Sequence, residues 1–251
     1  MYNWLSRTSF LACACVFATL LFVMPCPSMA ATDLPASASK QLTQSEANSL
    51  LVALGKRYRE INTLHCFFQQ KALTVGRLRE GKGEAFFMKP SNGGQVGLMR
   101  WEYTEPEPQI IINDGKEVQM YTPADKQLLI TSAETANSDI TYALFNGKSE
   151  LTSLFAVSPG DPTFNLASHP VLDEDPAIIL TPKMAQSQLK RAQVWLNKDN
   201  SIHRLLMEDY FGALTELTFT SLQFDTLKTS ENERMKLLKL DLAPGTETLR
   251  Q

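Results

Sequence analysis

The chain has 251 residues, of which 43% are hydrophobic and 20% are charged, and its formal net charge is −3. A mildly acidic chain without runs of lysine or arginine lacks the basic surface that nucleic-acid-binding proteins, and proteins held to anionic membranes by charge, require. We therefore expect neither a nucleic acid nor an anionic membrane surface as its partner.

Residues 1–30 have the three-part layout of a secretory signal peptide. A polar start with Arg7 precedes an apolar run over residues 10–24 and a small-residue site at residues 28–30. A transmembrane anchor is the alternative, but it needs about 20 uninterrupted apolar residues, and Pro25 and Pro27 end the run too early. We expect cleavage after Ala30, leaving a soluble exported protein. No linker divides residues 31–251, which predicts one domain rather than two small ones.

The four cysteines do not predict a disulfide. Cys13, Cys15 and Cys26 belong to the leader, and only Cys66 remains after cleavage. Cys26 follows Pro25 rather than a small residue, so it does not mark a lipid-anchored N-terminus. Cys66 lies in an alternating apolar run and is expected to behave as a small buried hydrophobe; a reactive thiol is the alternative.

The first predicted element is a helix over residues 44–61. Thr43 and Glu46 have the spacing of a capping box. An apolar stripe recurs at helical period behind them. It consists of Ala47, Leu50, Leu51, Leu54, Tyr58 and Ile61. Because the stripe is one-sided, the helix must lie on an apolar surface.

About eleven strands are predicted after this helix, because short apolar runs alternate with turn residues. They are residues 64–71, 82–88, 98–104, 109–112, 117–121, 127–131, 177–181, 188–196, 202–209, 214–224 and 237–242. The sequence Asn113–Lys116 predicts a hairpin whose Asp-Gly pair needs positive φ at both residues, and Asn197–Asn200 predicts another turn. A slip of the apolar phase between Phe219 and Leu222 predicts a β-bulge.

Between residues 138 and 157 the apolar period becomes helical, which predicts two short helices ending before Ser158. Sequential hairpins predict a strongly curved antiparallel sheet. The apolar helices near residues 44–61 and 138–157 are the elements available to cover its concave side. Large aromatic and methionine side chains on the strands are consistent with a lipid cavity and also with an ordinary core, and the pattern does not decide between the two.

Several motifs together resemble one known family. They are Phe68–Gln70, Glu80–Pro90, Arg100–Tyr103 with Pro106, Asn113–Lys116, Tyr121 with Pro123 and Gln127, Ala143–Gly147 and Leu151–Phe155. Their order and spacing over about 150 residues resemble the LolA-type lipoprotein carriers. The resemblance implies an incomplete antiparallel β-barrel of eleven strands with a helical lid over a hydrophobic cavity.

The resemblance also implies a function. Such proteins accept acylated lipoproteins from an inner-membrane lipoprotein-releasing ABC transporter and deliver them across the periplasm to the outer membrane, where a LolB-like acceptor is a further expected partner. We expect a monomer. The cavity residues expected from the resemblance are Phe68, Phe86, Met88, Met99, Trp101, Tyr103, Met120, Tyr121, Leu144, Phe145, Leu151 and Phe155.

The chain departs from the family at the lid-closing position. Lys89 stands where the best-known branch has an arginine, and it lacks the planar hydrogen-bonding fork of that residue. Arg100 matches an arginine of other branches. Ten residues separate Pro90 from Trp101, where the family usually has about four. We expect Lys89 and Arg100 to gate the lid by binding backbone carbonyls of residues 144–156.

Two alternatives remain. An enzyme is disfavoured because His65, His169 and His203 are isolated, and Asp173–Asp175 resembles a solvated turn rather than a metal site. We expect no catalytic residue, no metal and no cofactor. The second alternative is a binding module of the same fold that carries glycolipid or senses mislocalised lipoproteins.

Overall fold

The computed structural model describes residues 42–89, 97–133, 140–146, 150–166, 175–184 and 189–251. The predicted leader, His169, Asp173 and the loop before Gly97 therefore lie outside the described residues. Within those ranges, no helix combines the length and the apolar character needed to cross a membrane.

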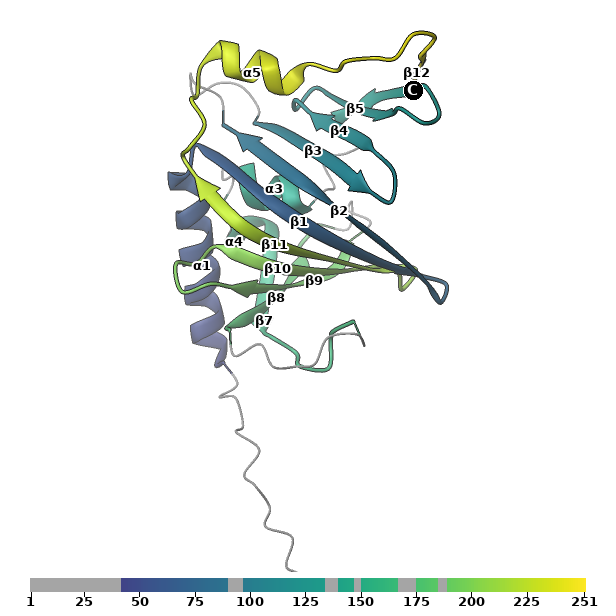
Figure 1. Ribbon diagram of the computed structural model, residues 1–251. Helices are drawn as coiled ribbons and strands as arrows, with labels where there is room; N and C mark the ends of the chain where they lie inside the picture. The colour runs from purple at the N-terminus through teal and green to yellow at the C-terminus, as the bar shows by residue number, and fades with distance from the viewer. Residues whose placement is uncertain (1–41, 90–96, 134–139, 147–149, 167–174, 185–188) are drawn as a thin grey trace, which may run out of the picture. The chain divides into compact units, whose positions relative to one another are not determined.

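A single twelve-stranded sheet forms most of the described chain (Figure 1). Its strands are β1 Thr63–Thr74, β2 Arg77–Met88, β3 Leu98–Glu105, β4 Gln109–Asn113, β5 Glu117–Thr122, β6 Gln127–Ser132, β7 Phe155–Pro159, β8 Ala177–Pro182, β9 Leu189–Leu196, β10 Ile202–Asp209, β11 Leu214–Phe224 and β12 Glu247–Arg250. Their order in the sheet is β12-β6-β5-β4-β3-β2-β1-β11-β10-β9-β8-β7. Neighbours are antiparallel except β12 and β6, which are parallel. The sheet is open, and the predicted incomplete barrel is confirmed.

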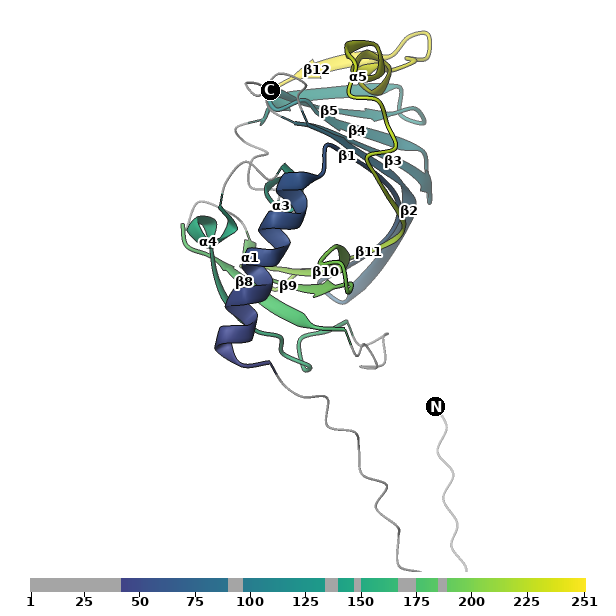
Figure 2. The same cartoon turned by 90° about the vertical axis from the view of Figure 1, so that its left-hand side faces the viewer.

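The helices lie on the two faces of this sheet. They are α1 Gln44–Glu60, α3 Ile140–Asn146, α4 Leu151–Leu154 and α5 Glu231–Leu238. Figure 2 shows the sheet curving around α1 and α3, with α5 on the outside of the curve. We call the face toward α1 and α3 the inner face, and the opposite one the outer face.

The predicted start of α1 is confirmed. The Thr43 hydroxyl accepts a hydrogen bond from the Glu46 amide at 3.2 Å, and the Glu46 carboxylate accepts one from the Thr43 amide at 2.7 Å. This reciprocal pair satisfies two backbone donors that a helix start leaves unpaired. The C-terminal end of α1 is also fixed, because the carboxylate of Asp225 accepts hydrogen bonds from the amides of Asn62 and Thr63.

The pairing register confirms the predicted bulge in β11. His65 pairs with Gln223, but Phe67 pairs with Thr220, so β11 holds one residue more than β1 at this point. Ser221, with φ of 52°, is the residue that absorbs the extra length. Strands β4 and β5 form the predicted hairpin, although of its Asp-Gly pair only Gly115 has positive φ.

Two predicted elements are wrong. Residues 155–157, expected in a helix, belong to β7, whose Phe155–Pro159 stretch pairs antiparallel with β8. Residues 237–242, expected as a strand, are the end of α5 and an irregular segment. Ser230 caps the start of that helix, because its hydroxyl accepts a hydrogen bond from the Glu233 amide. In both places a short apolar run fits either element, and the pairing partner decides.

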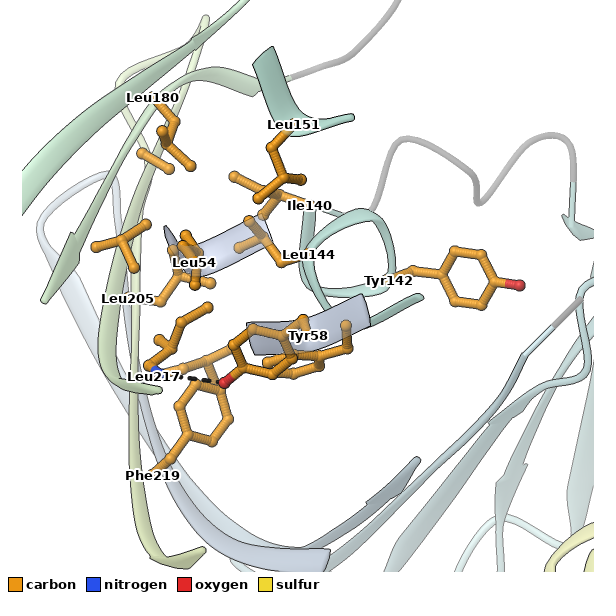
Figure 3. Close-up of a cluster of buried hydrophobic side chains, with 14 of the residues drawn as sticks. Leu54, Tyr58, Ile140, Tyr142, Leu144, Leu151, Leu180, Leu205, Leu217 and Phe219 are labelled. Atoms are coloured by element: carbon orange, nitrogen blue, oxygen red, sulfur yellow. Dashed lines mark hydrogen bonds between the residues drawn. The ribbon is translucent and has the colours of Figure 1, made fainter. Parts of the chain in front are cut away.

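The main core lies between the inner face and the helices. Leu54 and Tyr58 of α1 and Leu144 of α3 meet Leu205, Leu217 and Phe219 of the sheet (Figure 3). These side chains are almost completely buried. The Tyr58 hydroxyl accepts a hydrogen bond from the Ile202 amide at 3.0 Å, which joins α1 to the first residue of β10.

A second apolar layer covers part of the outer face. Met88 of β2, Leu98 of β3 and Ile112 of β4 pack against Leu237 and Leu240 of the C-terminal segment. Strand β3 is consequently buried on both faces, since Met99 and Trp101 point to the inner core.

Replacing Tyr58 by Phe tests the link between α1 and β10. The Ile202 amide is then left buried without its acceptor, and we expect a loss of about 1–3 kcal/mol in the free energy of unfolding. Urea denaturation followed by circular dichroism measures it. Tyr210→Phe removes a hydroxyl from an exposed tyrosine and is the control. Equal stability of the two variants would contradict the assigned role.

Candidate functional site

An apolar pocket of about 220 Å³ lies on the inner face. Strands β1, β3, β4, β5, β10 and β11 form its wall, and α3 contributes one residue. The lining residues are Gln70, Met99, Trp101, Tyr103, Ile111, Asn113, Val118, Thr141, Met207, Thr215 and Leu217. Pockets for drug-sized molecules measure about 300–1,000 Å³, so this one has room for only part of a long apolar ligand.

Edge-to-face aromatic contacts shape the wall of the pocket. The ring of Phe68 is 4.9 Å from that of Trp101 and 4.9 Å from that of Tyr103, both near perpendicular. Trp101 is in turn 6.4 Å from Phe219. This arrangement is the one that aromatic quadrupoles favour. The contacts link β3, β1 and β11 beside the open space.

Phe145 of α3 occupies the space next to the pocket. Its ring lies 5.2 Å from Tyr58, 5.8 Å from Phe219 and 6.4 Å from Phe87. It therefore contacts α1, β11 and β2 from a single position, and it is 3% exposed. Removing this one side chain from the interior would extend the pocket toward α1.

Three polar side chains of the pocket, those of Gln70, Tyr103 and Asn113, have hydrogen-bond partners. The Tyr103 hydroxyl donates to the Gln70 side-chain carbonyl at 2.5 Å, and the Asn113 side-chain carbonyl accepts from the Gly115 amide at 2.8 Å. These polar groups add little to the free-energy cost of binding an apolar ligand, because the ligand does not break their hydrogen bonds when it enters the pocket.

The structure brings most of the predicted cavity residues together on the inner face. Met99, Trp101 and Tyr103 line the pocket itself. Phe68, Leu144, Phe145, Leu151 and Phe155 belong to the core around it. Met120 is half-buried and shares the inner face with Val118 by strand alternation, but it does not line the pocket.

Three predicted residues lie on the outer face instead. Phe86 stacks on His65 at 4.5 Å, with the two rings nearly parallel. Met88 packs beneath the C-terminal segment. Tyr121 does the same, and its hydroxyl accepts a hydrogen bond from the Ala243 amide. Successive side chains of a strand point to opposite faces, so these residues cannot share a pocket with Phe87 and Val118.

Among the described residues, the two predicted gating residues bind carbonyls outside the segment 144–156. The ammonium of Lys89 donates to the carbonyls of Tyr58 at 2.6 Å and Arg59 at 2.7 Å, which are the unpaired carbonyls of the last turn of α1. Burial lowers the pKa of Lys89, and the Asp225 carboxylate opposes this effect. Arg100 points to the outer face, where it donates to the carbonyls of Leu237 and Lys239.

The alternation of side chains between the two faces of a strand is the sequence signal that would have corrected the predicted set of cavity residues. Counting every second residue from Trp101 selects Met99 and Tyr103 and rejects Arg100. The same count on β11 selects Thr215, Leu217 and Phe219. The residues that sequence reasoning missed are Gln70, Ile111, Asn113, Val118, Thr141, Met207, Thr215 and Leu217 in the pocket, with Phe219 beside it.

Different contacts hold the helices α3 and α4 near the pocket. Glu150, which precedes α4, forms an ion pair with Arg59 of α1 at 2.9 Å. The ammonium of Lys183 donates to the Thr152 carbonyl of α4 at 2.7 Å. The Tyr142 hydroxyl of α3 donates to the Gly97 carbonyl at 3.2 Å, and its ring points away from the cluster in Figure 3. Exposed ion pairs contribute about 0–1 kcal/mol, so apolar contacts supply most of the docking energy.

Catalytic chemistry has few candidate groups here. Cys66 is buried, and burial raises the pKa of its thiol to about 12, which disfavours the thiolate needed for a reactive cysteine. His65 is 2.9 Å from Glu84, and His203 is 3.2 Å from Asp175. In the part of the chain that the structure describes, no three His, Cys, Asp or Glu residues form a group that could hold a metal ion.

Comparison with known proteins gives one family. The model of the outer membrane lipoprotein carrier protein LolA family matches residues 59–231. The outer-membrane lipoprotein carrier protein of Salmonella paratyphi B is 24% identical over 156 residues, or 61% of this chain and 66% of the relative. The match thus spans just under two thirds of the length of this curated relative.

Solved structures are more distant. An uncharacterised conserved protein from Thermus thermophilus is 13% identical, with a TM-score of 0.47, over 81% of this chain and 98% of its own. A LolA superfamily protein from Nitrosomonas europaea is 13% identical, with a TM-score of 0.37, over 72% of this chain and 94% of its own. With TM-scores below 0.5, these likenesses carry no argument about the site.

The Lys89→Met variant tests how α1 is fixed beside the pocket. It keeps an apolar stem but removes the donors for the carbonyls of Tyr58 and Arg59. We expect the free energy of unfolding to fall by about 1–3 kcal/mol and the amides in the last turn of α1 to exchange faster with deuterium. Lys56→Met changes an exposed lysine of the same helix whose ion-pair partner is Glu60 at 3.9 Å. If the two variants exchange alike, Lys89 does not fix the helix.

Proposed function

Because this chain belongs to the outer membrane lipoprotein carrier protein LolA family, we propose that it is a periplasmic carrier for the acyl chains of lipoproteins. In this proposal it accepts lipoproteins from an inner-membrane ABC transporter and passes them toward the outer membrane. Residues 1–30 serve as the cleaved export signal, and residues 31–251 form the carrier domain. The observation that carries the proposal is the apolar pocket on the inner face, with Phe145 as a removable neighbour.

The energetics of carriage favour such a pocket. Each methylene of an acyl chain that is removed from water contributes about 0.8 kcal/mol, so a lipoprotein does not cross an aqueous compartment unaided. Apolar burial has no direction. A pocket lined by side chains such as Met99, Ile111 and Leu217 therefore accepts chains without recognising the sequence of the attached protein.

Loading requires the pocket to grow. Its volume of about 220 Å³ is below that of ordinary ligand sites, and the adjacent space is filled by Phe145. Aromatic pairs contribute about 0.5–1.5 kcal/mol each beyond their buried area. An acyl chain that displaces α3 takes the place of Phe145 against the core residues. The free-energy cost of opening is therefore smaller than the cost of exposing the core to water.

Release requires that binding is not too tight. Returning Phe145 to Tyr58, Phe87 and Phe219 is favourable in the empty protein, and this return competes with the bound chain. The competition lowers the net affinity without any change in the pocket wall. A membrane-bound acceptor of the LolB type would then take the cargo from a monomeric carrier.

Replacing Thr215 by Trp tests whether the pocket binds acyl chains. Thr215 lines the pocket on β11, and an indole there fills much of the space, so we expect the affinity for a fluorescent diacylated peptide to fall by at least about tenfold. Titration followed by fluorescence anisotropy measures the Kd. Thr220→Trp places the same residue on the exposed side of the same strand and leaves the Kd unchanged. Unchanged binding in both variants would place the acyl site elsewhere.

The cargo itself is identified from the protein purified from its own periplasm. We expect mass spectrometry of the extracted material to find acylated peptides. Free glycolipid without acylated peptides would instead favour the alternative binding module of the same fold and would overturn the lipoprotein proposal.

A further inference from the structure

Two hairpin turns lie side by side at one end of the sheet. Val75 and Gly76 connect β1 to β2, and residues 210–213 connect β10 to β11. The pairing of Leu73 with Leu214 places both turns next to each other. In Figure 1 they form the end of the strands that is remote from α1.

Both turns present apolar side chains to water. Val75 is 96% exposed and Phe211 is 92% exposed, with Tyr210 and Leu78 beside them at 60% and 48%. We call these four the rim residues. Single exposed hydrophobic residues are ordinary, but a group of them on adjacent turns marks an interaction site.

The backbone at both turns holds these side chains outward. Val75 has φ of 48°, a conformation that a β-branched residue rarely adopts and that asparagine or glycine would take without strain. The carboxylate of Asp209 accepts hydrogen bonds from the amides of Phe211 and Ala213, both at 2.8 Å. Phe211 is thus exposed from an ordered turn. A strained backbone that serves an exposed apolar side chain indicates function rather than packing.

The charges around the rim residues are locally positive. Arg77 and Arg79 are exposed, and within the described residues neither is found in an ion pair. The nearby carboxylates have partners. Glu80 lies 3.8 Å from Lys71, Glu208 accepts hydrogen bonds from Lys190 and Arg191, and Asp209 accepts hydrogen bonds from the turn amides described above. The negative net charge of the whole chain conceals this local excess.

The turns that carry Val75, Tyr210 and Phe211 adjoin strands that line the pocket. Gln70 of β1, Met207 of β10 and Thr215 of β11 line it, and each lies within a few residues of the turns. An apolar chain that leaves the pocket along these strands would therefore arrive at the rim residues.

We propose that the rim residues insert into the surface of a phospholipid bilayer, with Arg77 and Arg79 contacting anionic headgroups. Exposed apolar tips flanked by arginine, with a tyrosine among them, match the chemistry of the membrane interface. A stable protein interface buries about 1,200–2,000 Å² in total, which calls for a broader surface than two narrow turns. This binding goes beyond the carrier function and does not depend on it.

Sedimentation with vesicles tests the proposal on the protein in its exported form. We expect binding to vesicles of phosphatidylethanolamine with phosphatidylglycerol, and weaker binding to phosphatidylcholine alone. The double variant Val75→Asn, Phe211→Ser should lower the partition coefficient by about tenfold. Arg77→Gln with Arg79→Gln should lower the partition coefficient only for the anionic vesicles.

Two control variants should bind as the wild type does. One is Met235→Ser, which changes an exposed apolar residue of α5, and the other is Lys56→Gln with Lys198→Gln.

A fluorescent label gives a second readout. Cys66 is buried and has a raised pKa, so an environment-sensitive dye attaches selectively to Phe211→Cys or to Met235→Cys. Vesicles should shift the emission to the blue at position 211 and leave it unchanged at position 235. The proposal is overturned if the wild-type protein binds none of the vesicles. It is also overturned if Met235→Ser lowers vesicle binding as much as the double variant of the rim residues does. If the wild-type protein binds no vesicles while the rim variants slow lipoprotein transfer, the rim residues bind a protein. Since acyl-peptide affinity is measured separately, failure here leaves the carrier function standing.

Discussion

The structure depends on how an open sheet covers its apolar inner face. A closed barrel would bury that face by itself, but this sheet is open, with β12 and β7 as its two edge strands. Helices α1 and α3 supply the missing cover through Tyr58, Leu144 and Phe145. In the proposed carrier function the same surface is buried in the empty protein and offered to a ligand. A removable cover would serve both needs, whereas a fully packed core would serve only the first.

Part of the outer face of the sheet is covered by the C-terminal segment, which holds it through polar and apolar contacts. Arg100 binds two carbonyls of the C-terminal segment, and Met88, Leu98 and Ile112 pack beneath it. This layer holds β2, β3 and β4 together from behind. In the proposed opening of the cover on the inner face, this layer would keep the strands that line the pocket in position. Arg100, which was expected to gate the lid, instead fixes the C-terminal segment to the outer face of the sheet.

Much of the fold follows from local sequence rules. The capping box at Thr43, the hairpin at Asn113–Lys116 and the bulge near Ser221 each have a short-range physical cause, and each is found. The errors at Phe86, Met88 and Tyr121 have another origin. Large residues follow one another along Phe86–Met88 and at Met120 and Tyr121. Composition there does not reveal which face a residue serves. Only the alternation from a known inner residue, or the presence of the C-terminal segment behind the sheet, separates them.

The partners of Lys89 indicate which helix moves. Its ammonium binds the end of α1, the carboxylate of Asp225 holds the following amides, and Tyr58 binds β10. These polar contacts tie α1 to three separate strands or connections. Helix α3 is held by apolar contacts and by the buried hydrogen bond from the Tyr142 hydroxyl to the Gly97 carbonyl. The start of α4 adds exposed polar contacts, which contribute little. Apolar contacts are the ones that an acyl chain replaces in kind, whereas it offers no donor for the carbonyls that Lys89 satisfies. Ligand entry should therefore displace α3 and leave α1 in place.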